Sequence, residues 1–312
     1  MDFPIRPFTP ADAPAVADLL NAVECNAGAN PAFDAAEILE WSAEWGDLDR
    51  DTRLVLGPDG APIAFGVAQA PPPDGFRAEA FGAVAPRWRG RGIGRELIAW
   101  QLARIDTIYR SAAPGVDWIV SSSANVADAD ALRLFERVGM SVRRYFLEMD
   151  AVTADAPRHA PVDGFRVAVA DPVDRRALYD AHMAAFADHF GYQRRRFEDW
   201  VRTSLDSTSF RADLSRIAYV GDDIASYVLS YDDVLPDKLY IGQVGTRSAS
   251  RGLGLASSLL SEVLVAAGAA GKHSARLNVD ASSLTGAVGV YERTGFAVSG
   301  RMVAYAKQVD PA

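Results

Sequence analysis

Residues 81–94 read FGAVAPRWRGRGIG, and residues 243–256 read QVGTRSASRGLGLA. Each stretch carries an extended apolar segment into an Arg-Gly-x-Gly loop, and apolar residues at helical spacing follow each loop. The sequence therefore predicts the same strand, glycine turn and helix twice within the 312 residues of the chain.

A second pair of matching segments lies further along each half. Residues 131–140 read ALRLFERVGM, and residues 287–296 read AVGVYERTGF. Two landmarks in the same order and at similar spacing indicate a tandem duplication. Each copy mixes predicted strands and helices, so the expected fold class is α/β.

The domain boundary is placed where periodic patterning stops. Residues 151–164 are dominated by Ala, Pro, Asp and Thr, which are typical of a linker. We therefore expect an N-terminal domain at residues 1–150, a linker at 151–164 and a C-terminal domain at 165–312.

Composition narrows the possible partners. The formal charge of −9 argues against broad binding to nucleic acid, for which a basic surface supplies most of the affinity. No apolar run is long enough to cross a membrane, and the first residues do not resemble a secretory signal. One cysteine and four scattered histidines suggest neither a disulfide nor a metal site. A cytoplasmic protein without a metal is expected, and its oligomeric state is left open.

A glycine loop that opens a helix is a natural anion site. The first amides of the helix have no internal partner, and the helix dipole favours negative charge there. Glycines also let the backbone approach a diphosphate closely. A plain structural turn is the alternative for either loop taken singly. The full Gly-x-Gly-x-x-Gly run of dinucleotide folds and the Gly-Lys-Ser/Thr of nucleotide P-loops are both missing.

The combination of these motifs resembles the GNAT superfamily of N-acetyltransferases. Arg-x-x-Gly-x-Gly/Ala after a strand, followed about forty residues later by Tyr-Glu-Arg-x-Gly-Phe, carries the resemblance. It covers both halves, in the tandem arrangement of mycothiol synthase-like members. It implies acetyl-CoA as co-substrate and a small-molecule amine as acceptor. It also implies a mixed sheet, an α+β arrangement, whose fourth and fifth strands splay apart around the pantetheine arm.

By this resemblance the fourth strands are residues 78–84 and 240–246, and the fifth strands are 117–121 and 276–280. The expected coenzyme A contacts in the C-terminal domain are Val244, Gly245, Thr246, Arg251, Gly252, Leu253, Gly254, Leu255, Ala256 and Ser257. In the N-terminal domain they are Gly82, Ala83, Val84, Arg89, Gly90, Arg91, Gly92, Ile93, Gly94 and Arg95.

The resemblance also assigns catalytic candidates. A tyrosine at the place of Tyr291 usually protonates the leaving thiolate, and the N-terminal copy has Phe135 there. The C-terminal domain is therefore expected to be catalytic and the N-terminal one degenerate. The general base is less well defined, because Tyr240 stands where mycothiol synthase-like members carry a glutamate. Asp280 is our candidate, with Asp237 or an ordered water as alternatives.

The acceptor is expected to enter over the first helices of the C-terminal half. Residues 184–192, with Phe197 and Trp200, combine aromatic and polar groups, and Asp188 or His189 would lie near the amine. Amphipathic packing plus a surface histidine is the favoured alternative, because aromatic stripes usually belong to a core. Two alternative functions exist for the whole chain. It could bind coenzyme A without catalysis, or it could be an enzyme that uses another acyl-CoA.

Overall fold

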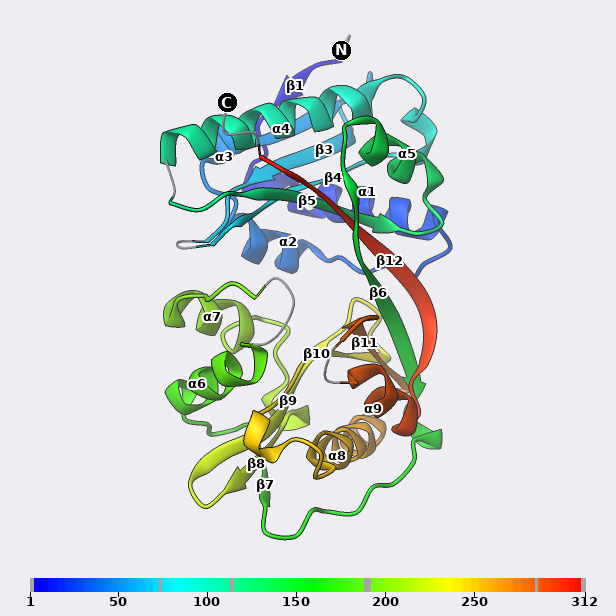
Figure 1. Ribbon diagram of the computed structural model, residues 1–312. Coiled ribbons are helices and arrows are strands. Elements are labelled where there is room, and N and C mark those ends of the chain that lie inside the picture. The colour runs from blue at the N-terminus through cyan, green and yellow to red at the C-terminus, as the bar shows by residue number, and fades with distance from the viewer. Residues whose placement is uncertain (1–2, 73–74, 113–114, 188–191, 284–285, 310–312) are drawn as a thin grey trace. The chain divides into compact units, whose positions relative to one another are not determined.

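The computed structural model describes residues 3–72, 75–112, 115–187, 192–283 and 286–309. The chain forms two compact units (Figure 1). The first contains the described residues up to Arg144 together with those from Met302 onward, and the second contains Tyr145–Arg301. Each unit is a mixed sheet with helices on both faces, as the sequence predicts.

The first unit has the strand order β1-β2-β3-β4-β5-β12. Central strand β3 is buried along six successive residues, which is expected when helices cover both faces of a sheet. Helices α1 and α2 pack on one face and α4 and α5 on the other. The strands are β1 (Ile5–Arg6), β2 (Thr52–Leu56), β3 (Pro62–Gln69), β4 (Arg77–Val84) and β5 (Ile119–Asn125), and the helices are α1 (Ala13–Asn26), α2 (Ala35–Ser42), α3 (Leu48–Asp51), α4 (Ile93–Ala112) and α5 (Ala129–Arg137).

The second unit repeats this plan with the order β6-β11-β10-β9-β8-β7. Helices α6 and α7 cover one face, and α8 and α9 cover the other. The strands are β7 (Arg166–Val169), β8 (Arg216–Val220), β9 (Asp223–Asp232), β10 (Lys238–Thr246) and β11 (Ser274–Asp280), and the helices are α6 (Arg175–Phe186), α7 (Phe197–Ser204), α8 (Leu255–Ala269) and α9 (Ala287–Arg293).

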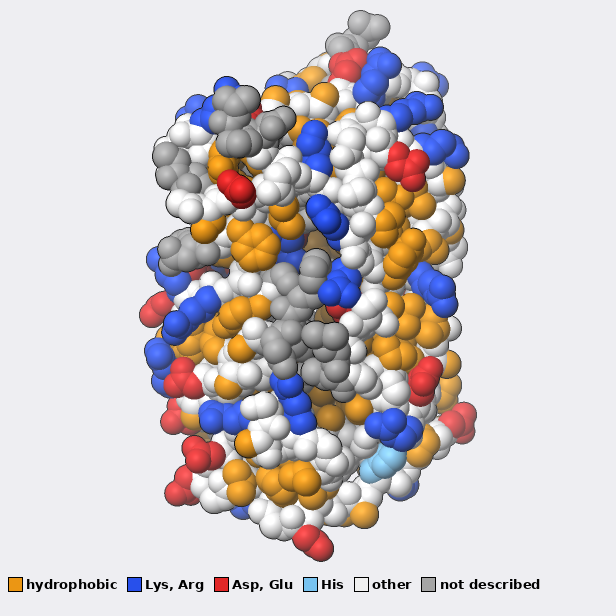
Figure 2. Space-filling view, viewed as in Figure 1, with side chains coloured by type: hydrophobic (Ala, Val, Ile, Leu, Met, Phe, Trp, Pro, Cys, Tyr) orange, Lys and Arg blue, Asp and Glu red, His pale blue; other side chains and the backbone are white. Residues whose placement is uncertain are grey.

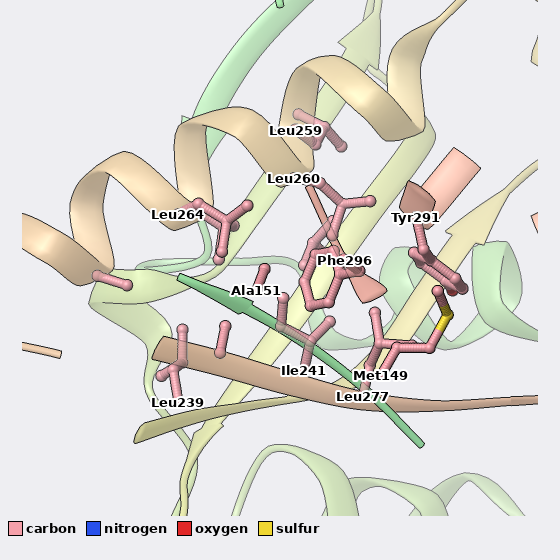
Figure 3. Packing of buried hydrophobic residues seen from close by; sticks show 14 of the residues in the cluster. Met149, Ala151, Leu239, Ile241, Leu259, Leu260, Leu264, Leu277, Tyr291 and Phe296 are labelled. Carbon is pink, nitrogen blue, oxygen red and sulfur yellow. The ribbon is translucent and has the colours of Figure 1, made fainter. Parts of the chain in front are cut away.

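The main core of the second unit lies under α8 (Figure 3). Leu259, Leu260 and Leu264 are fully buried in this layer, where they face apolar residues of the sheet. Met149 and Ala151 join the core from β6 (Ser141–Val152), beside Leu277 of β11. The apolar residues at helical spacing after the glycine loop thus form the helix that covers this core.

Two long strands serve both units. The end of β6 pairs with β11 from Phe146 to Val152, and the end of β12 (Ala297–Gln308) pairs with β5 from Met302 to Gln308. Each half of the sequence therefore supplies the last strand of the other half's unit. The units differ from the domains expected at 1–150 and 165–312, because residues 145–164 belong with the second unit and the end of β12 with the first.

The segment expected to be a free linker is held against the second unit. The Thr153 hydroxyl donates to the carbonyl oxygen of Lys272 at 2.8 Å. The His159 amide donates to the Ser261 hydroxyl at 3.1 Å, and the His159 ring nitrogen Nε2 lies 3.0 Å from the carbonyl of Arg293. These contacts make residues 153–159 part of the folded unit.

Candidate active site

The second glycine loop opens α8 as predicted. Gly252 and Gly254 have φ values of +78° and +87°, in the left-handed region that favours glycine. Gly254 is the N-cap of α8, so no side chain caps the amides of the first turn. A 15-residue helix whose first amides are uncapped offers donors and a positive dipole end to an anion.

Strands β10 and β11 diverge beside this loop. They pair in parallel from Lys238 with Ser274 to Ile241 with Leu277, and no further pair follows. A bulge lies in β10 between Ile241 and Gln243. The edge of β10 beyond the bulge is therefore free of β11, which is the splay that the resemblance implies. Backbone groups along such an open edge can bind an extended ligand.

A cleft of about 530 Å³ brings loop and splay together. All ten residues expected to contact coenzyme A in this half line it, from Val244–Thr246 and from Arg251–Ser257. Tyr291 of α9 lines it as well. The sequence analysis missed His159, Ala160 and Val162, which also reach the cleft because the predicted linker folds against this unit.

Tyr291 keeps its proton at neutral pH. Its side chain is only 8% exposed, and burial is the main cause that raises its pKa above the ordinary value of a phenol, with a smaller contribution from nearby Tyr240. A buried phenol at the wall of the cleft is a hydrogen-bond and proton donor. Figure 3 shows the ring beside the core under α8, next to Phe296.

Tyr227 supports the open end of β10 from the other face of the sheet. Its ring takes the place that a side chain on Gly245 would fill, since a Cβ there would meet the Tyr227 hydroxyl oxygen at 2.5 Å. That hydroxyl lies 2.6 Å from Nδ1 of His182, on α6. Gly245 is therefore required for close packing, while Gly252 and Gly254 are required for their backbone conformation.

The first unit has a comparable cleft of about 360 Å³. Nine of the ten residues expected to contact coenzyme A in this half line it, namely Gly82–Val84, Arg89, Gly90 and Gly92–Arg95. Arg91 does not line it, because its guanidinium stacks over the Trp88 ring at 4.6 Å. Phe135, 6% exposed, occupies the place of Tyr291, so this cleft lacks the phenol.

The two loop arginines turn back to the strand that precedes the loop. Nε of Arg251 donates to the Thr246 carbonyl at 3.2 Å, and Nε of Arg89 donates to the Val84 carbonyl at 3.4 Å. Arg89 also forms two hydrogen bonds with Asp128, at 2.9 and 2.8 Å. Both arginines thus fix the shape of the loop, and the charge of Arg89 is already balanced.

Other predicted site residues lie away from the cleft walls. Asp280 ends β11, and its carboxylate accepts a hydrogen bond from the Ser282 amide at 2.8 Å, which orders the turn. Trp200 and Phe197 belong to the aromatic core under α6 and α7, as the packing alternative predicts. Asp188 and His189 fall outside the described residues.

Within the described ranges, no group of three or more potential ligands could hold a metal ion. The same residues include no helix with the length and apolar character needed to span a membrane.

Comparison with known proteins agrees with this geometry. The acetyltransferase (GNAT) family model matches residues 22–140 and again residues 175–296. A GCN5-related N-acetyltransferase from Sphaerobacter thermophilus is 31% identical, with a TM-score of 0.79 over 99% of this chain and 96% of that one. No curated protein matches the sequence.

Two further solved structures share the fold at lower identity. A tandem GNAT protein from the clavulanic acid biosynthesis pathway is 15% identical, with a TM-score of 0.67 over the full length of both chains. A GNAT-family acetyltransferase from Colwellia psychrerythraea is 12% identical, with a TM-score of 0.56 over 97% of this chain and 99% of that one. The chain therefore belongs to the acetyltransferase (GNAT) family, as an acyl-CoA-dependent N-acyltransferase with two tandem domains.

Proposed function

We propose that the second unit transfers an acetyl group from acetyl-CoA to the primary amine of a small molecule by direct attack. The observation that carries the proposal is that three features line one cleft: the uncapped start of α8, the open edge of β10 and the phenol of Tyr291.

The donor fits these walls. The amides at Gly252–Ala256 would hold its diphosphate, and the backbone of Val244–Thr246 would hydrogen-bond its pantetheine amides. A side chain at Gly252 or Gly254 would meet no atom within 4 Å, so the loop leaves open space in front of its backbone. The thioester end would then lie near the splay, toward Tyr291.

The chemistry begins with a proton loss from the acceptor ammonium, after which the neutral nitrogen attacks the thioester carbonyl carbon to form the C–N bond. The carbonyl oxygen becomes an oxyanion that backbone amides can stabilise. The C–S bond then breaks, the sulfur keeps its electron pair, and Tyr291 gives it a proton. The nitrogen, which is cationic after the attack, loses its second proton, and a proton returned through water restores the Tyr291 phenol.

Direct attack is favoured over a covalent acyl-enzyme. The only cysteine of the chain, Cys25, is an exposed residue on α1 of the first unit. The second unit therefore offers no thiol to carry the acyl group.

For the first unit we propose binding of coenzyme A without transfer. Its glycine loop and cleft match those of the second unit, but Phe135 cannot donate a proton to a thiolate. Two alternatives remain for the whole chain. Both clefts could bind coenzyme A without catalysis, or the enzyme could use a longer acyl group.

A panel of primary amines tests the proposal. Release of free thiol from acetyl-CoA is followed for amino acids, polyamines, amino sugars and peptide termini, and the product is identified by its mass increase. Propionyl- and butyryl-CoA are run in parallel to test the acyl group. Thiol release without an acylated amine, or no release with any acceptor, would contradict the proposal.

A further inference from the structure

Glu148 is a strand residue that the first half of the sequence supplies to the second unit. It lies on β6 directly opposite Asn278 of β11. Its neighbours Leu147 and Met149 point into the core under α8. Because successive side chains of a strand point to opposite faces, Glu148 points to the other face, as do Arg276 and Asn278.

Glu148 lies close to the point where β10 and β11 diverge. The last pair between β10 and β11 is Ile241 with Leu277, so Asn278 is the first residue of β11 beyond it. Neighbouring strands lie about 5 Å apart, so Glu148 stands one strand away from the gap between β10 and β11. Glu148 and the first open position of β11 thus share one face of the sheet, with Asn278 between Glu148 and the gap.

The charges around Glu148 are already paired with one another. Lys238 Nζ lies 2.7 Å from an oxygen of Asp150, and Arg276 Nε lies 2.5 Å from an oxygen of Asp233. Among the described residues, the Glu148 carboxylate has neither a hydrogen bond nor an ion pair. Glu148 is thus the excess acid of a cluster with two cations and three carboxylates.

Partial burial gives this carboxylate the character of a base. Desolvation is the main cause that raises the pKa of Glu148, and Asp150 and Asp233 add to it. Arg276 and Lys238 act in the opposite direction. A carboxylate with a raised pKa accepts a proton more readily than a solvated one.

Gly300 of β12 packs beside Glu148. A Cβ at Gly300 would make ordinary van der Waals contact with this side chain, 3.4 Å from its Cβ and 3.6 Å from a carboxylate oxygen. A side chain larger than that of alanine would crowd the carboxylate.

The first unit has no acidic residue at the position that matches Glu148. In the first unit the pairing of β5 with β12 begins with Ile119 opposite Gln308. In the second unit the pairing of β11 with β6 begins with Ser274 opposite Val152. Four residues further along, Ser123 faces Ala304 in the first unit. At the matching position of the second unit, Asn278 faces Glu148. The unit without the Tyr291 phenol is therefore also the unit without this carboxylate.

We infer that Glu148 is the catalytic base of the second unit and takes the proton from the acceptor's ammonium. The ammonium N–H bond breaks, its electron pair stays on nitrogen for the attack, and the proton moves to a Glu148 oxygen directly or through one water. This inference rests on the proposed function and replaces Asp280 in the role of base.

The test is Glu148→Gln in the full chain, with the best amine of the panel. Proton transfer by a placed base contributes about 10²- to 10⁴-fold, so kcat should fall by at least about 100-fold near pH 7. The deficit should shrink as the pH approaches the pKa of the acceptor ammonium, because free amine then forms in solution. Acetyl-CoA affinity, measured by calorimetry, should stay unchanged and also reports correct folding.

Three further variants sharpen the result. Glu148→Asp should keep part of the activity, and added formate should raise the rate of Glu148→Ala, which copies Ala304. Asp150→Asn, two residues along the same face, keeps the Glu148 carboxylate and should keep most of kcat, with its acidic limb shifted to lower pH because Asp150 helps to raise the pKa of Glu148. If Glu148→Gln retains wild-type kcat, or raises KM alone with an unchanged pH profile, the inference is wrong. If the unmodified chain acylates no amine, the proposed function fails instead, and the inference falls with it.

Discussion

At the scale of single residues, Tyr291 carries the sharpest difference between the two clefts. Tyr291→Phe installs the residue that the first unit has at Phe135, so the ring and its packing are kept. Loss of the proton donor should lower kcat by about 10²- to 10³-fold while acetyl-CoA affinity stays nearly constant. Steady-state kinetics together with calorimetry measures both quantities. An unchanged kcat would remove Tyr291 from the mechanism.

Gly254 allows the charge at the start of α8 to be tested separately from its shape. Asp and Asn tolerate the left-handed conformation about equally, and a side chain at Gly254 meets no atom within 4 Å. Gly254→Asp should therefore weaken coenzyme A binding in the second unit by about tenfold or more, through repulsion of the diphosphate. Gly254→Asn is the control and should change affinity little. Equal losses in both variants would mean that backbone strain, and not charge, is responsible.

Asp12 predicts an effect of pH on stability. Two hydrogen bonds from the Arg6 guanidinium, at 2.7 and 2.6 Å, are the main cause that lowers its pKa to about 2. A lowered pKa in the folded state adds stability above the unfolded pKa of about 4, and this stability is lost as the pH falls toward 2. Urea unfolding at a series of pH values should show a shallower acid loss for Asp12→Asn. A curve that matches the unmodified chain would show that the pair contributes nothing.

Residue patterns predicted the glycine loops and the contrast of Tyr291 with Phe135, because these chemical signals are local. They did not predict the inward turn of Arg89, whose partner Asp128 lies 39 residues away. Glu148 was missed for the same reason, since its place opposite Asn278 depends on a pairing across 130 residues. No local pattern sets such a glutamate apart from a surface residue.

At the scale of elements, the order of strands and helices was predictable, but the unit that each last strand joins was not. The repeat makes β6 the natural last strand of the first half. Only the register shows that its end belongs beside β11, where Leu147, Met149 and Ala151 join the second core. Alternating strands of similar composition fit either partner, so periodicity alone cannot choose.

Fragments of the chain test this exchange of strands. Residues 145–301 contain the whole second unit, whereas residues 165–312 lack the end of β6. Loss of buried side chains such as Leu147 and Met149 costs about 2–5 kcal/mol each, against about 5–15 kcal/mol for a typical domain. The fragment 145–301 should give a cooperative thermal transition, and 165–312 should not. Equal folding of both fragments would show that β6 is dispensable.

At the scale of the whole molecule, two clefts with glycine loops predict two donor sites per chain. Calorimetry with coenzyme A should give a stoichiometry of two. Gly92→Asp should weaken binding at the first-unit site and Gly254→Asp at the second, and only the latter should raise the KM for acetyl-CoA in turnover. A stoichiometry of one in the unmodified chain would restrict binding to a single cleft.

The surface charge of the molecule bears on the class of partner. On the face shown in Figure 2, basic and acidic side chains are interspersed rather than gathered by sign. Such a mixed surface on a chain of net charge −9 favours solubility more than attraction of a polyanion.

The exchange of strands also determines the order in which the two units can be completed during translation. Residues 302–308 are translated after the whole of the second unit, yet they form the strand that pairs with β5 of the first unit. The second unit, whose residues run without a break from 145 to 301, is complete before that strand has emerged. Domains usually fold from the N-terminus onward during translation, but here the first unit receives its last strand after the second unit has been made. The nascent first half must hold β5 without β12 until residues 302–308 have been made.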